Sequence, residues 1–408
     1  MSLRSWAFAS LLISFSAVAQ TSPGLSQLQK QLVENNNELR ASQAKLEAQK
    51  AQAQSSWGAL LPELSASAGY AKEKTLHDND DGYVGYLNGS WNIFRGGQDW
   101  QNRKISQREY DIAGLDHEII SRRLHRELGE TYYKALLNSQ FISFDTEKLQ
   151  FLKNQRAMAA KKINAGLTSN VDAIELDLEE STLSAEIETH KTDLQISLDE
   201  LKILINSPDP VAVSAKDTFP RMSKADFSLT DLSRNPSIMK QNSMEETSQL
   251  RRRQALGEFL PTVDLNAQYG RIIPQYDDPL QGNESRLSVL MTWTFFSGFE
   301  SWNKSKSASS LEKSEAFAKS NLAQQLQTQV HSLSNKASEL LQLQQLLEKR
   351  QVLTQKYYDL TLSEYRRGVK NSSDLANATN SLFDNKTRLI EVQKELAVLK
   401  LKFDELTK

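Results

Sequence analysis

The chain has 408 residues, no cysteine, and 49 basic against 51 acidic side chains, for a formal net charge of −2. The lack of cysteine excludes a disulfide framework, a zinc–thiolate site and thiol catalysis. The balanced charge, with a pI near 6.3, gives no reason to expect nucleic acid as a partner.

The first 19 residues have the pattern of a secretory signal peptide. Arg4 precedes the apolar stretch WAFASLLISF, and the small residues Ala17 and Ala19 suit a cleavage site. We therefore expect residues 1–19 to be a signal peptide and the mature chain to begin near Gln20. No later stretch approaches the roughly 18 consecutive apolar residues of a transmembrane helix, so insertion into a membrane would require strands closed into a barrel.

The first structural unit is expected to begin with a helix and a strand hairpin. Residues from about Leu25 to Gly58 are rich in Gln, Ala, Glu and Leu, which favours a helix. Two stretches with alternating residues follow between about 63 and 94, and a period of two indicates strands. The polar segment KEKTLHDNDDG joins these stretches, so the pattern predicts a hairpin.

A pair of very long helices is expected next. The segment from about Gln98 to Ala165 contains no proline, and its apolar residues recur at spacings of three and four, as in a coiled coil. At 1.5 Å per residue such a helix would extend roughly 100 Å. A second helix is expected to return from about Asn170 to Asn206, with the hairpin tip at about 165–171.

The rest of the chain repeats this plan after a linker at 207–228. The phrase GSWNIFRGGQDW at 89–100 returns as MTWTFFSGFESW 202 positions later, and LLPEL returns as FLPTV 199 positions later. Constant spacing on each side of one short insertion indicates a tandem duplication, which divides the chain into repeats at 20–206 and 229–408. The second repeat predicts a helix at about 229–256, a hairpin at about 262–296, long helices at about 300–367 and 373–408, and a tip at about 367–373.

Four of the six tryptophans lie in the duplicated phrase. Each copy ends a row of alternating apolar residues, breaks at glycine and starts a long helix. Aromatic rings form girdles where membrane strands meet the water interface, and glycine permits a sharp turn. We therefore expect membrane-interface aromatics at Trp91, Trp100, Trp293 and Trp302, and strand-to-helix turns at Gly96, Gly97 and Gly298.

Neither a metal site, a cofactor site nor an enzyme active site is predicted. The five histidines are scattered without metal-ligand spacing, and the chain has no glycine-rich phosphate loop of a nucleotide-binding protein. No group of residues suggests acid–base or nucleophilic catalysis. The protein is therefore expected not to be an enzyme.

The order of these features resembles the TolC-like outer-membrane efflux protein family, the outer membrane factors of tripartite efflux pumps and type I secretion. The resemblance rests on the tandem halves, Leu-Pro before a strand, Phe-x-Gly after it, and Gly-x5-Asp at each helix joint. It implies an α+β membrane protein with four strands per chain in a trimeric 12-stranded outer-membrane β-barrel, continued by a long antiparallel coiled-coil α-helical barrel in the periplasm. Four strands are also too few to close alone, since the smallest single-chain barrels have about eight.

The resemblance also implies the function and the partners. The protein would be the exit duct of an efflux pump or secretion system in the outer membrane of a Gram-negative bacterium. Its partners would be two further copies in a homotrimer, a periplasmic adaptor, an inner-membrane RND or ABC-type pump, and outer-membrane lipid. The alternative is a periplasmic coiled-coil adaptor or scaffold protein, which would need one helical hairpin flanked by lipoyl-like β domains rather than two equal halves.

The same resemblance implies that the helix–helix joints form the gate. By motif position, the constriction residues would be Asp374, Tyr365, Lys370, Asp172 and Asn377. The hairpin tips that contact the adaptor would be Gly166, Leu167, Gly368 and Val369. From the residues themselves, each aspartate lies in the first turn of a returning helix, where a carboxylate can also cap the helix.

Overall fold

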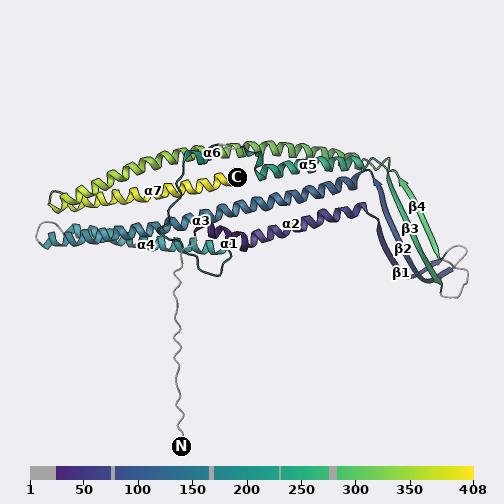
Figure 1. The fold of residues 1–408 in the computed structure, drawn as a ribbon, viewed down its shortest axis with the longest axis horizontal. Coiled ribbons are helices and arrows are strands. Elements are labelled where there is room, and N and C mark those ends of the chain that lie inside the picture. Colours follow the sequence, from purple (N-terminus) through teal and green to yellow (C-terminus); the bar gives the residue numbers. More distant parts are fainter. Residues whose placement is uncertain (1–23, 75–78, 165–169, 229–230, 275–282) are drawn as a thin grey trace, which may run out of the picture.

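The molecule is elongated, with a small sheet at one end and two pairs of long helices that extend to the other (Figure 1). A computed structural model describes residues 24–74, 79–164, 170–228, 231–274 and 283–408. The expected signal peptide lies outside these described residues.

The two tandem repeats are confirmed, and each has the same order of helices and strands. The first repeat comprises α1 (Leu25–Asn35), α2 (Asn37–Ser55), β1 (Glu63–Lys74), β2 (Asn79–Arg95), α3 (Gln98–Asn164) and α4 (Asn170–Leu204). The second comprises α5 (Pro236–Gly257), β3 (Thr262–Pro274), β4 (Glu284–Thr292), α6 (Glu300–Arg366) and α7 (Ser372–Thr407). Short 3-10 helices are η1 (Ser56–Leu60), η2 (Lys224–Phe227) and η3 (Leu232–Arg234).

The long helices agree with the sequence prediction to within one or two residues. Both α3 and α6 have 67 residues, which at 1.5 Å each is about 100 Å. They run unbroken because neither contains proline and both carry an apolar stripe that their neighbours cover.

The prediction of one continuous first helix is wrong, because the chain breaks at Asn36 between α1 and α2. Asn36 has an extended ψ of 126° and caps α2, where its side chain accepts from the backbone N–H of Leu39 at 2.9 Å. Its Nδ2 donates to the carbonyl of Leu204 at the end of α4, at 2.8 Å. One asparagine side chain therefore bonds an otherwise unpaired N–H at the start of α2 and an otherwise unpaired carbonyl at the end of α4. Both bonds favour a break in the helix at this residue.

The second repeat has the same junction at Asn235, so α5 starts at Pro236 instead of near residue 229. The Asn235 side chain accepts from the N–H of Ser237 at 2.8 Å and donates to the carbonyl of Leu406 at 2.7 Å. Proline suits the first helical position, where no intrahelical N–H bond is lost. The duplication is therefore preserved in individual hydrogen bonds.

The sheet has the order β1-β2-β3-β4, and every neighbouring pair is antiparallel. Pairing between β2 and β3 joins the two repeats, with Gly89 opposite Ala267 and Trp91 opposite Leu265. Within the described chain, β1 and β4 each have a neighbour on one side only. The sheet consequently has two open edges.

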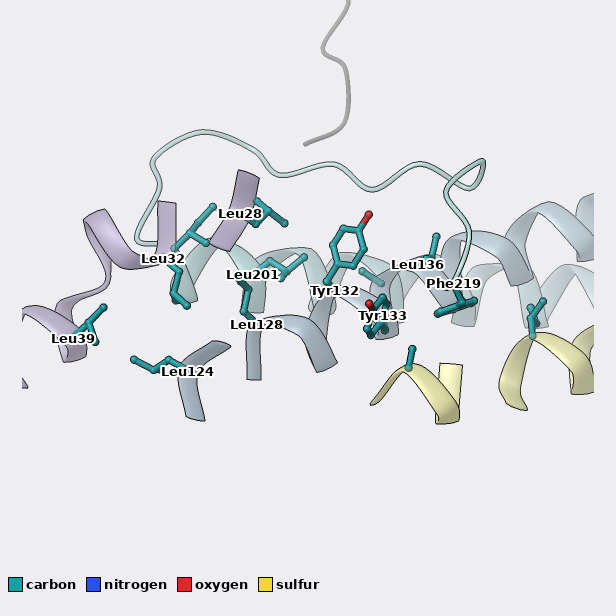
Figure 2. Close-up of a cluster of buried hydrophobic side chains, with 14 residues drawn as sticks. Leu28, Leu32, Leu39, Leu124, Leu128, Tyr132, Tyr133, Leu136, Leu201 and Phe219 are labelled. Atoms are coloured by element: carbon teal, nitrogen blue, oxygen red, sulfur yellow. The ribbon is translucent and has the colours of Figure 1, made fainter. Parts of the chain in front are cut away.

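The helices pack around several buried clusters, of which the largest joins both repeats. Leu28 and Leu32 of α1 meet Leu128 of α3 and Leu201 of α4 there, as Figure 2 shows. The helices α3 and α7 approach closely in the middle of the molecule, because Gly129 leaves room where a Cβ would lie 2.5 Å from Leu401 Cδ1. Both α5 and α7 of the second repeat lie against α3, and α4 and α6 lie on the outer flanks (Figure 1).

Candidate functional site

The tip between α6 and α7 is a well-defined helix C-cap. Gly368 has a φ of +80°, the left-handed conformation expected for a glycine at this joint. Its N–H donates to the carbonyl of Tyr365 at 3.1 Å, and the N–H of Val369 donates to that of Glu364 at 3.0 Å. These two bonds define a Schellman motif, so the turn is closed by backbone groups. Val369 projects from the tip and is 70% exposed.

Asp374 closes the start of the returning helix. Its backbone N–H donates to Asn371 Oδ1 at 2.8 Å, and its Oδ2 accepts from the N–H of Asn371 at 3.3 Å. This reciprocal pair is a capping box, which confirms the structural role expected for the carboxylate. Lys370 Nζ lies 3.9 Å from Asp374 Oδ2, and both side chains are more than a third exposed. Such a long, solvated pair contributes at most about 0.5 kcal/mol.

Tyr365 occupies a different environment from Lys370. The residue is only 2% exposed and belongs to a buried cluster that also includes Leu375, Ala378 and Leu382 of the returning helix. Its hydroxyl lies 3.4 Å from Ser372 Oγ. Within one chain, Tyr365 therefore holds its own hairpin closed, while Lys370 and Asp374 face solvent at the tip.

The remaining predicted gate residues are only partly described. Gly166 and Leu167 lie outside the described residues, and for Asp172 only the helical backbone near the start of α4 is described. Asn377 is exposed on α7, one turn after Asp374. The expected contact of Asp172 with Tyr365 or Lys370 therefore stays a prediction.

A cavity of about 300 Å³ lies between α3, α5 and α6. Its charged rim is already paired, since Lys240 Nζ lies 2.7 Å from Asp116 Oδ1 and Arg251 donates to Glu109 at 2.9 Å. These two ion pairs connect α5 to α3. In the described part of the chain no group of three His, Asp or Glu side chains could hold a metal ion.

At the opposite end, the duplicated tryptophans make the same hydrogen bond in both repeats. Trp91 Nε1 donates to the carbonyl of Leu60, and Trp293 Nε1 donates to that of Phe259, each at 3.1 Å. Both indoles stay substantially exposed, at 40% and 59%. Each indole therefore has its N–H satisfied while the residue stays partly exposed.

The two tryptophans in the first helical turns are also exposed, Trp100 at 45% and Trp302 at 65%. The Arg103 guanidinium lies 3.6 Å from the ring centroid of Trp57 and 5.1 Å from that of Trp100. Trp57 and Arg103 were not predicted, although Arg103 follows Trp100 by three residues and so shares its helix face.

Both strand-to-helix turns use two consecutive left-handed residues. The φ angles are +58° and +74° at Gly96 and Gly97, and +63° and +68° at Gly298 and Phe299. The sequence prediction missed Phe299, although it stands 202 positions after Gly97. A left-handed conformation costs a residue with a Cβ about 1–2 kcal/mol.

Replacing Phe299 with glycine removes this conformational cost but increases the entropy of the unfolded chain, which offsets part of the gain. We therefore expect the variant to be more stable by about 0.5–1 kcal/mol. Thermal unfolding of the detergent-purified protein would measure the change. Phe296→Ala is the matched control, because it removes the ring that contacts Phe299 at a centroid distance of 5.6 Å and leaves the backbone angle unchanged. A lower unfolding temperature for Phe299→Gly alone would contradict the expectation.

No described helix has both the length and the apolar character needed to cross a membrane. No curated protein sequence matches the chain significantly. Solved structures do match its fold along nearly the whole length, at sequence identities too low to show more than the fold.

Three such structures are outer-membrane proteins. VceC of Vibrio cholerae aligns with a TM-score of 0.82 and 15% identity, over 94% of this chain and 96% of that one. The open state of the MtrE channel of Neisseria gonorrhoeae aligns at 0.81 and 16%, over 95% and 89%. The CmeC channel of Campylobacter jejuni aligns at 0.80 and 14%, over 100% and 93%.

The family profile described as "Outer membrane efflux protein" matches residues 28–207 and 230–400, which together make up most of the chain. The two matched segments correspond to the two structural repeats. A family of efflux channels also agrees with the expectation that the protein is not an enzyme. The chain belongs to the outer membrane efflux protein family.

Proposed function

We propose that the protein is the exit duct of a tripartite efflux pump or a type I secretion system. As a member of its family, it is an efflux protein of the Gram-negative outer membrane. The duct would carry solutes passively from the periplasm to the outside, and its adaptor and inner-membrane pump would supply opening and energy.

The observation that carries this proposal is the open sheet at the end of the long helices. Four strands leave unpaired backbone groups on the outer edges of β1 and β4. Unpaired edges are not stable in lipid, and four strands are too few to close on themselves. Three copies arranged in a ring would close the sheet, and α3, α4, α6 and α7 of each copy would continue it as a tube.

The outer surface of the sheet supports contact with lipid. Leu64, Leu287 and Val289 project from the strands and are 82%, 75% and 66% exposed. Large apolar side chains gathered on an exposed surface mark a membrane or protein contact. Trp91 and Trp293 lie at the helix-proximal end of this surface, where an aromatic girdle would stand.

The opposite end would be the periplasmic mouth. In the proposed trimer the Asp374 carboxylates form a ring of three, with Asn377 one turn behind them. Lys370 is exposed and only weakly held by Asp374, so it would reach Asp172 of a neighbouring hairpin. The adaptor would contact the tips at Gly166, Leu167, Gly368 and Val369, where Val369 offers an exposed apolar side chain.

The test is assembly and conductance of the full-length protein. Protein extracted from outer membranes in detergent is expected to be a trimer by native mass spectrometry and to form ion channels in planar bilayers. Deletion of the gene should raise sensitivity to exported compounds, and the wild-type copy should restore resistance. A folded, monodisperse monomer in buffer without detergent would overturn the proposal.

A further inference from the structure

A cavity of about 610 Å³ lies between the first turns of α3 and the last turns of α5. Its lining is basic, with one carboxylate, that of Glu246, against the side chains of Arg103, Lys104, Arg108 and Arg253. Lys104 lies six residues after the start of α3, and Arg253 lies four residues before the end of α5. Both are therefore within about 10 Å of the helix ends that adjoin the strands.

The positive charge of this cavity is mostly unpaired. The one carboxylate of the lining is already used, since Glu246 lies 2.9 Å from Arg108. No carboxylate of the described chain lies within 4.0 Å of the charged groups of Arg103, Lys104 or Arg253. Three cations therefore remain for an anionic partner.

Arg103 shows most directly that a partner group is missing. Its Nε is buried and has no hydrogen-bond partner in the described chain. Its guanidinium is held against two rings, 3.6 Å from the centroid of Trp57 and 5.1 Å from that of Trp100. A buried charged donor without an acceptor is costly, so an acceptor is expected from outside the chain.

The three consecutive arginines of α5 divide into two kinds. Arg251 lies 2.9 Å from Glu109 of α3, and Arg252 lies 2.9 Å from Glu312 of α6, so both connect α5 to its neighbours. Arg253 lines the basic cavity instead. Two of the three arginines thus have a structural role, and the third is left for a ligand.

Comparison of the two repeats indicates that the fold does not require this cluster. At the constant offsets of the duplication, Ser305 is the counterpart of Arg103, and Gln54 is the counterpart of Arg253. The strand-to-helix junction forms in both repeats, although only one has these arginines. A role in binding explains the difference better than a role in folding.

The position of the cavity favours a lipid phosphate as its ligand. The fork of N–H donors in arginine matches phosphate oxygens, and lysine adds a point charge. Arg103 and Lys104 both lie within 6 Å of the ring of Trp100, which is predicted to lie at the membrane interface. Lipid headgroups extend roughly 5–8 Å beyond the hydrocarbon, a distance that long basic side chains can span.

We propose that this cavity binds the phosphate headgroup of an anionic phospholipid from the inner leaflet of the outer membrane, with Arg103, Lys104 and Arg253 as the donors. The inference requires the strands to lie in the membrane, but it does not depend on the passage of solutes through the proposed duct.

The first test measures lipid binding to the full-length protein in detergent by native mass spectrometry, with phosphatidylglycerol, phosphatidylcholine or inorganic phosphate added. We expect one phosphatidylglycerol per chain, bound at least about fivefold more tightly than phosphatidylcholine. Inorganic phosphate should not displace it. Lys104→Gln combined with Arg253→Gln should lower the affinity for phosphatidylglycerol about tenfold or more, because two cations near the anionic headgroup are lost.

A charge-matched variant controls for the general positive charge of this surface. Arg251→Gln combined with Arg252→Gln removes the same charge from the two adjacent positions, outside the basic cavity, and should leave the affinity for phosphatidylglycerol unchanged. Arg103→Gln should lower the affinity as Lys104→Gln with Arg253→Gln does. Circular dichroism should show unchanged helix content in every variant that loses lipid.

The outcomes separate this inference from the proposed function. Equal wild-type affinity for the two lipids, or the same loss of affinity in the charge-matched variant, would overturn the lipid site. Displacement of phosphatidylglycerol by inorganic phosphate would assign the cavity to a soluble anion and overturn it as well. A wild-type protein that binds phosphatidylglycerol as expected but forms no channel would overturn the duct alone.

Discussion

Replacing Gly96 with valine is expected to remove the folded protein from the outer membrane almost completely. Valine would have to hold a φ of +58° while its Cβ overlaps the carbonyl oxygen of Gly257. The left-handed conformation and the overpacking together cost about 2–5 kcal/mol, a large part of the stability of a typical domain. Immunoblots of outer-membrane fractions would measure the loss.

The adjacent glycine provides the control. Gly97 also has a positive φ, but a Cβ there would meet no atom within 4 Å, and its equivalent in the second repeat is Phe299. Gly97→Ala should therefore cost only about 1–2 kcal/mol and leave the protein in the membrane. Wild-type amounts of Gly96→Val in the outer membrane would show that the contact with Gly257 does not hold the junction.

Combining Tyr365→Phe with Lys370→Ser is expected to raise single-channel conductance several-fold in planar bilayers. In the proposed trimer each hydrogen bond or ion pair between neighbouring hairpins contributes about 0.5–1.5 kcal/mol. Because the trimer is symmetric, the substitutions remove three copies of each interaction at once. Lys370→Ser should account for most of the effect, because Tyr365 is buried in its own hairpin. Unchanged conductance, in a channel shown to be closed at rest, would place the gate elsewhere.

The charge of Asp374 can be separated from its role as a cap. Asp374→Asn removes the carboxylate charge and keeps an oxygen able to accept from the N–H of Asn371, whereas Asp374→Ala loses both. Both variants should reduce cation preference and block by multivalent cations, since a ring of carboxylates attracts cations. Asp374→Ala should in addition lower thermal stability by about 1 kcal/mol. Unchanged selectivity in both variants would leave Asp374 with its capping role alone.

The periodic elements could be predicted because their signals are local. Apolar residues spaced three and four apart over more than sixty residues, without proline, predict a long helix. The alternation around Trp91 and Trp293 likewise predicts strands. Since the duplication preserves these periods at a constant offset, the two halves and their hairpin tips follow from comparison of the chain with itself.

Contacts between distant residues could not be predicted in this way. Asn36 breaks the first helix because its side chain bonds to Leu204, 168 residues away. Tyr365 and Lys370 are neighbours in the tip sequence, yet one is buried between α6 and α7 and the other is exposed, because the turn at Gly368 sets their directions. Motif position alone placed both side chains in the gate.

The sequence by itself determined the two repeats, the long helices, the strand hairpins and the left-handed turn at Gly368, because each depends on the spacing of residues close along the chain. The tertiary structure alone decided how the repeats face each other. It brings Gly96 against Gly257 and leaves Gly58 and Gly298 uncovered, although all four are the same residue type. The local sequence is equivalent in the two repeats, but a single chain has only one junction between its repeats. Packing at that junction therefore gives equivalent residues different surroundings.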